Sequence, residues 1–130
     1  HLYIALFTYK PIHMTYNENL AGRIRLNIEQ RSLSFLEKKM FGGICFMVDA
    51  KMCVGVVKND LMARIDPEIY EHSLDKKGAR AMDFTQRTMK GFVYINEEGT
   101  DLEADLDYWI QLCLDFNPKA KASKKKKKTA

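Results

Sequence analysis

The stretch that decides the fold is residues 44–65, which read ICFMVDAKMCVGVVKNDLMARI. Three short apolar runs are separated by two turns, with the runs at 44–48, 52–57 and 61–65 and the turns at 49–51 and 58–60. Short runs bounded by turn residues are typical of antiparallel strands joined by hairpins. Because two of the runs are apolar at nearly every position, we expect both of their faces to be partly covered.

The first hairpin also bears on the cysteines. A two-residue turn at Asp49-Ala50 places Phe46 opposite Cys53 and points Cys45 to the other face, whereas a slip of one residue sets Cys45 directly against Cys53. The chain has three cysteines, an odd number, without a CxxC pair. We therefore expect three free, buried thiols and a reducing compartment rather than a disulfide framework.

Helical patterns flank this stretch on both sides. Apolar residues recur every four positions at Leu20, Ile24 and Ile28, which predicts a helix over 17–31 with Asn17 as its N-cap. After the strands, Asp66-Pro67 predicts the start of a second helix, because Asp accepts from free amides and Pro suits the first helical position.

A third helix is predicted near the end of the sequence. Thr100 and Glu103 have the spacing of a capping box, and Asn117-Pro118 ends the pattern. Its apolar residues lie on one face: Leu102, Leu106, Trp109, Cys113 and Phe116.

The remaining elements complete the fold class. Residues 35–40 also have strand character, 82–88 indicate a loop or short strand, and 89–95 indicate a strand. The order is helix, strands, helix, strand, helix, without the alternation of a parallel sheet. We therefore predict an α+β fold of two layers, with an antiparallel sheet of about five strands covered by helices.

The charge is distributed unevenly along the 130 residues. Seven lysines follow Pro118 without an acid, which leaves 14 basic against 17 acidic residues in 1–118, a net charge of −3 within a total of +4. We predict one domain over 14–118 and a disordered, lysine-rich tail over 119–130. Residues 1–13 are expected to be an upstream extension or a misassigned start, with an added edge strand as the alternative, and their apolar run is too short to span a bilayer.

Catalytic patterns are missing from the residues. His72 is mid-helix without a nucleophile beside it, and the sequence holds no Walker loop, no dinucleotide fingerprint and no metal-ligand spacing. We expect a protein that is not an enzyme and that needs no cofactor or metal.

Two short segments are unusual enough to suggest a contact surface. The glycine pair in Met40-Phe41-Gly42-Gly43 permits a tight turn or a bulge, and Arg87 to Phe92 is basic and apolar together. With Arg64, Lys38 and Lys39, the second segment would form a small basic patch on the sheet, although solvated strand ends explain the same charges.

The same segments resemble a known family. Lys39-Met40-Phe41-Gly42-Gly43 with the strand 44–48, Leu61 to Pro67, Arg87 to Phe92, and Leu106 to Ile110 resemble, in this order, the landmarks of the TfoX N-terminal domain. The resemblance covers about Tyr16 to Pro118. It departs from the family where Thr88 replaces a frequent proline and Ala50 a frequent hairpin glycine, which weighs against a type I′ turn.

The resemblance implies a two-layer fold similar to type III secretion chaperones and a bacterial cytoplasmic protein. The family's namesakes regulate natural competence together with a transcription activator. They carry a second domain, and at the corresponding place this sequence has only the lysine-rich segment. We expect a stand-alone regulatory module that binds a protein, such as a transcription regulator, and forms a homodimer by analogy with the chaperones. The expected partner surface comprises Phe41, Gly42, Gly43, Arg64, Arg87, Met89 and Lys90.

The alternative is a nucleic-acid-associated protein anchored through its tail, because lysines that contact phosphate release counterions. The residues that would bind are Lys119, Lys121, Lys124, Lys125, Lys126, Lys127 and Lys128.

Overall fold

Six strands form one antiparallel sheet in a computed structural model that describes residues 16–40, 42–84 and 87–122, apart from the side chains of 83–88. The strand order is β1-β2-β3-β4-β6-β5. The strands are β1 (Leu36–Met40), β2 (Gly43–Val48), β3 (Lys51–Val57), β4 (Asp60–Arg64), β5 (Ala79–Phe84) and β6 (Arg87–Ile95).

Among the described residues, two long helices and two short ones accompany the sheet. They are α2 (Glu18–Gln30), α3 (Tyr70–Ser73), α4 (Glu97–Thr100) and α5 (Glu103–Phe116), with 3₁₀ turns η2 (Pro67–Ile69) and η3 (Asn117–Lys119). The predicted α+β class and the antiparallel sheet are confirmed. The sixth strand is β5, which falls partly in the segment expected to be a loop or short strand.

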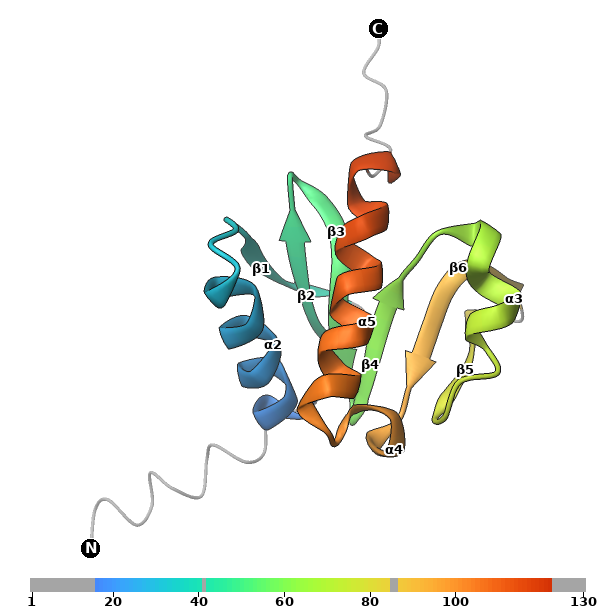
Figure 1. The fold of residues 1–130 in the computed structure, drawn as a ribbon. Helices are drawn as coiled ribbons and strands as arrows, with labels where there is room; N and C mark the ends of the chain where they lie inside the picture. Colours follow the sequence, from blue (N-terminus) through green and yellow to red (C-terminus); the bar gives the residue numbers. More distant parts are fainter. Residues whose placement is uncertain (1–15, 41, 85–86, 123–130) are drawn as a thin grey trace, which may run out of the picture.

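Helices α2 and α5 pack side by side on one face of the sheet (Figure 1). The main core lies between these layers, because each helix turns its apolar stripe toward the strands. Its members on α2 and α5 are Leu20, Ala21, Ile24, Ile28, Leu106, Trp109, Ile110 and Cys113, and its strand members include Ile44, Phe46, Val54, Val56, Leu61, Ala63, Val93 and Ile95.

The ends of α2 and η2 follow the sequence. The Asn17 side chain accepts a hydrogen bond from the Leu20 amide at 3.0 Å, so the predicted N-cap is confirmed. The carboxylate of Asp66 accepts from the Glu68 amide at 2.9 Å, and Pro67 occupies the first turn, as expected.

The predicted capping box of α5 is wrong. Thr100 ends the separate short helix α4, which is capped by Asn96, and Leu102 occupies the N-cap of α5 without a side-chain bond. Glu103 accepts instead from the Nε of Arg23 at 2.9 Å. Leu102 precedes the first turn and is therefore 62% exposed rather than part of the buried face.

The register of the first hairpin also differs from the prediction. Asp49 and Ala50 both have positive φ, as a two-residue type I′ turn requires, although alanine is an unfavourable residue there. Met47 pairs with Met52, but Phe46 pairs with Val54, so Cys53 is the extra residue of a bulge. Phe46 therefore does not face Cys53, and neither does Cys45.

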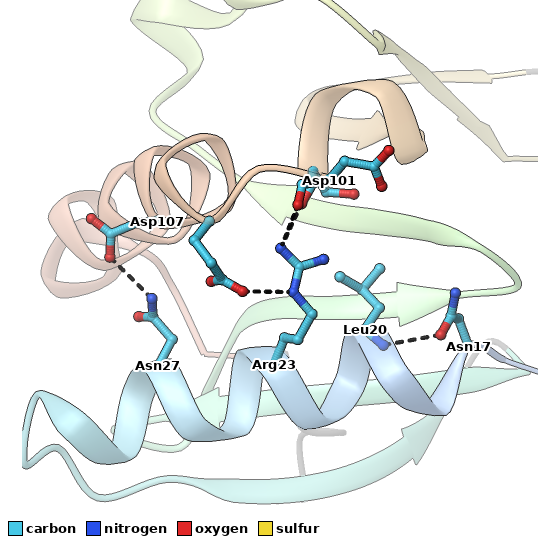
Figure 2. A network of polar contacts seen from close by, with 8 residues as sticks. Asn17, Leu20, Arg23, Asn27, Asp101 and Asp107 are labelled. Atoms are coloured by element: carbon cyan, nitrogen blue, oxygen red, sulfur yellow. Dashed lines mark hydrogen bonds and ion pairs between the residues drawn. The ribbon is translucent and has the colours of Figure 1, made fainter.

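A polar seam joins the outer surfaces of the two long helices (Figure 2). The Arg23 guanidinium donates to Glu103 and, at 2.7 Å, to the carbonyl oxygen of Thr100. Asn27 and Arg31 both donate to the Asp107 carboxylate, at 3.0 and 2.6 Å. These bonds connect α2 with α5, the first and the last long elements in the described part of the chain.

Candidate functional site: the helix-free face of the sheet

The second face of the sheet carries a separate apolar cluster, here called the methionine face. Every member lies on a strand, and each of the six strands contributes at least one. Among the described residues, no helical side chain belongs to it. The buried members are Cys45, Met62 and Met82, and the half-buried members are Met40, Met47, Met52, Val57, Phe92 and Tyr94.

Strand alternation explains why these residues gather. Met62 pairs with Gly55 and Tyr94, whereas its neighbours Leu61 and Ala63 point into the main core. Five of the seven methionines of the chain are brought together in this way. Methionine is unbranched and polarisable, and surfaces rich in it adapt to differently shaped partners.

Two arginines pack on aromatic rings of this face. The Arg80 guanidinium lies 4.9 Å from the Tyr94 ring centroid and pairs with the Asp60 carboxylate at 2.6 Å. The Arg64 guanidinium lies 5.5 Å from the Phe92 ring centroid. Such cation–π contacts hold the arginine heads against apolar surface.

Arg64 has a further role at the end of β4. It donates to the carbonyl oxygens of Met52 at 3.2 Å and Lys121 at 3.1 Å, and lies 6.0 Å from the ring centroid of Phe116. Burial lowers the pKa of its guanidinium from the ordinary value. The side chain predicted to contact a partner is therefore also tied to the segment after α5.

The other predicted surface residues are spread over several strands. Gly43 begins β2 and is buried. It packs so closely that an added Cβ would stand 2.0 Å from the Val56 carbonyl oxygen. Gly42 is exposed in the β1–β2 turn with a φ of +75°. On β6, Met89 is half-buried and Lys90 is exposed. Phe41 and the side chain of Arg87 lie outside the described residues.

The lysines of the proposed basic patch do not share one face. Lys38 pairs with Cys45 and shares its face, whereas Lys39 pairs with the core residue Ile44. Of the lysine-rich segment, Lys119 lies 3.4 Å from an Asp66 carboxylate oxygen and Lys121 is exposed. Residues 1–13 and the lysines Lys124, Lys125, Lys126, Lys127 and Lys128 lie outside the described residues.

The three thiols are free and buried, as predicted. Burial raises the pKa of Cys45 to about 11 and that of Cys53 to about 12, and raises the pKa of Cys113 well above its ordinary value. Thiols of this kind are poor nucleophiles at neutral pH.

Two hollows on the helical side are less suited to a partner. The larger is lined by Arg23, Leu26, Asn27, Glu103 and Asp107, whose charged members already pair with one another or with α2. In the smaller, Lys77 pairs with Asp105 at 3.8 Å and Lys76 lies over the Tyr108 ring.

The described part of the chain offers few residues for a site of another kind. In that part, no three His, Cys, Asp or Glu side chains are grouped to hold a metal ion. His72 is exposed on α3. No described helix combines the length and the apolar character needed to cross a bilayer.

Within residues 16–40, 42–84 and 87–122, the arrangement defines a small α+β domain with one sheet face under helices and no helix over the other. A model of the TfoX N-terminal domain matches residues 34–117, well over half of the chain. The chain therefore belongs to the TfoX N-terminal domain family, which confirms the resemblance found in the sequence. Comparisons with curated proteins and with solved structures found no match.

The methionine face was not predicted as a unit. Its signal was present as methionines at alternate positions of successive strands, such as Met40, Met47, Met52 and Met62. Because β2, β3 and β4 are apolar at the intervening positions too, alternation alone could not tell which face the helices would cover.

Proposed function

We propose that this protein is a non-enzymatic regulatory module that binds a protein partner through its methionine face. The observation that carries the proposal is an apolar, adaptable sheet face without a helix over it among the described residues. Apolar faces of sheets are normally buried against another layer, whereas six of the nine members of this face are only half-buried, and apolar side chains at the surface can mark interaction sites. Membership of the family supports, at the family level, a module related to competence regulators.

The chemistry of the remaining groups supports a binding role over catalysis. The thiols are buried with raised pKa values, and His72 is a solvated side chain on a short helix. We place the protein in the bacterial cytoplasm, with a transcription regulator as the expected class of partner. This placement rests on the family and on thiols that stay free.

Photo-crosslinking in cells of the source organism tests the proposal with a matched pair of positions. Leu36 shares the side of the sheet of its pairing partner Met47 and is 72% exposed, and Leu102 beside α5 is 62% exposed. A photoreactive residue at Leu36 or Met47 should yield a discrete protein adduct that is absent at Leu102. Equal adducts at both sites, or none at Leu36 and Met47, would refute the assigned face.

The lysine-rich segment gives a second candidate function, attachment to nucleic acid. The residues after Pro118 include seven lysines and no acidic residue. Seven phosphate contacts predict that log K for duplex DNA falls with log salt at a slope of about −6. The matched truncation should end at Ala122, because Arg64 binds the carbonyl of Lys121. Full binding by the truncated chain would refute tail anchoring.

A further inference from the structure

One straight row of paired residues crosses the methionine face from edge to edge. Lys38 on β1 pairs with Cys45, Cys45 with Gly55, Gly55 with Met62, Met62 with Tyr94, and Tyr94 with Arg80 on β5. The row thus has a cation at each end and apolar residues or glycine between them. Five strand intervals of about 4.8 Å separate the two ends by about 24 Å.

The charge of this face is positive. Its cations are Lys38, Arg64 and Arg80, and Asp60 pairs with Arg80 at 2.6 Å. Within the described part of the chain, no carboxylate is paired with Lys38. Lys38 is exposed at the edge strand, so a carboxylate from outside can reach it.

On the helical side, the α4–α5 segment is acidic, and three of its carboxylates pair with Arg23, Arg31 and Lys77. From Glu97 to Phe116, the α4–α5 segment carries seven acidic residues and no basic one. An acidic partner is repelled from that side and attracted to the methionine face, which is the kind of complementarity that sets orientation and partner choice.

Resting on the proposed function, we propose that the methionine face binds an acidic amphipathic helix of a partner protein. Its apolar stripe would lie along the row, flanked by Met40 on one side and by Met47 and Met52 on the other. Its carboxylates would reach Lys38 at one edge and the Arg80 region at the other. A helix of about 16 residues spans the row, at 1.5 Å per residue. Apolar anchors at helical spacing are a common way for a helix to bind an apolar surface.

A second copy of this chain fits the face less well. In a symmetric dimer both copies present the same surface, which brings the cations of one face against those of the other. Contact with the acidic α4–α5 side of another copy would be head-to-tail and would not close. The charges therefore favour a different protein as the occupant.

The test is a titration of the full chain, labelled with ¹³C at the methionine methyl groups, with synthetic 18-residue amphipathic peptides. One peptide carries glutamates at both ends of a leucine stripe, and its control carries lysines instead. We expect the methyl signals of Met40, Met47 and Met52 to shift with the acidic peptide, and affinity to fall at least about fivefold with the basic one. Equal binding of both peptides, or no shift at these methyls, overturns the proposal.

Neighbouring lysines supply the matched variants. Lys38→Glu should weaken the acidic peptide about fivefold or more, whereas Lys39→Glu, on the other side of the same strand, should leave affinity within about twofold. An equal effect of the two reversals overturns the assigned edge. If a partner is crosslinked at Leu36 or Met47 but neither peptide binds, the proposed function is retained and the acidic helix is rejected. The acidic helix is also rejected if duplex DNA shifts the methyl signals of Met40, Met47 and Met52.

Discussion

The guanidinium of Arg64 donates a hydrogen bond to the carbonyl oxygen of Lys121, 57 residues later in the sequence, at 3.1 Å. The same group donates to Met52 and packs near the rings of Phe92 and Phe116. One side chain thereby connects two neighbouring strands, the end of α5 and the chain beyond η3. The chain after η3 is thereby held to the sheet at Lys121.

Replacing this arginine should destabilise the domain. Arg64→Ala removes two hydrogen bonds from a charged donor and leaves the Met52 carbonyl oxygen without this donor, so we expect a loss of about 2 kcal/mol in the free energy of unfolding. Urea denaturation measures it, with the exposed Lys39→Ala as the control. An Arg64→Ala midpoint equal to that of the control would show that the contacts contribute nothing.

Two glycines should respond in opposite directions to the same substitution. Gly22 lies inside α2, and the nearest neighbouring atom is 3.8 Å from where an alanine Cβ would stand, so Gly22→Ala should stabilise by about 0.5–1 kcal/mol. At Gly55 the added Cβ would stand 2.6 Å from the Ile44 carbonyl oxygen, so Gly55→Ala should lower the melting temperature. Thermal unfolding of the pair checks both signs, and stabilisation by Gly55→Ala would contradict the observed β2–β3 spacing.

The thiols should be protected in the native protein. Burial raises the pKa of Cys45 to about 11 and of Cys53 to about 12, and the pKa of Cys113 is also raised, so few thiolates exist at pH 8. We expect alkylation by iodoacetamide to be slow at all three sites, and fast once denaturant unfolds the chain. Mass spectrometry of the labelled protein gives the rates, and rapid native labelling of any one thiol would be inconsistent with its burial.

The Arg25–Glu37 pair should make stability depend on acid. The Arg25 side chain, which donates to Glu37 at 2.8 Å, holds the pKa of this carboxyl below its ordinary value. The unfolded chain therefore takes up the proton first, and the stabilisation is fully present above about pH 4.5 and is lost as pH falls through the folded pKa. Because both side chains are partly exposed, we expect Glu37→Gln to lower the free energy of unfolding by only about 0.5 kcal/mol at pH 7.

A double-mutant cycle with Arg25→Gln is the control for this pair. The losses in the free energy of unfolding from the two single changes should add to more than the loss in the double variant. The loss from Glu37→Gln should shrink as the pH falls from 6 to 3. Additive losses that do not vary with pH would rule out the pair as their source.

The family match begins at residue 34 and leaves out α2, which makes a truncation informative. Leu20, Ile24 and Ile28 are buried in the main core, and removing them forfeits roughly 5–9 kcal/mol, comparable to the stability of a whole small domain. We expect residues 16–122 to unfold cooperatively by circular dichroism and residues 34–117 to lack a cooperative transition. A cooperative transition in the shorter fragment would mean that α2 is dispensable.

Local signals in the sequence were sufficient for the two long helices and for most strands, but not for the short helix α4. Asn17 and Asp66 cap because their side chains reach amides two or three residues away, a property of the chain nearby. The bulge at Cys53 was missed because it depends on how two strands pair. The capping box at Glu103 was predicted wrongly because Arg23, 80 residues away, competes for that carboxylate.

The candidate site was predictable only in fragments. Arg64 was singled out as part of a basic patch and Gly43 as part of a glycine pair. The structure places them on different strands, at the end of β4 and the start of β2. The row from Lys38 to Arg80 requires the strand order, in which β6 lies between β4 and β5. No pattern within one strand encodes which strands become neighbours.

The seam between α2 and α5 has a consequence for the order of events at the ribosome. Arg23 and Glu103 are 80 residues apart, and chains are made at about 5–20 residues per second, so α2 exists for roughly 4–16 seconds before its partner is complete. In that interval α2 lacks the neighbouring helix α5, which lies beside it on the sheet in the finished fold. Of the two long helices, α2 is thus the one on which chaperones have the longer time to act.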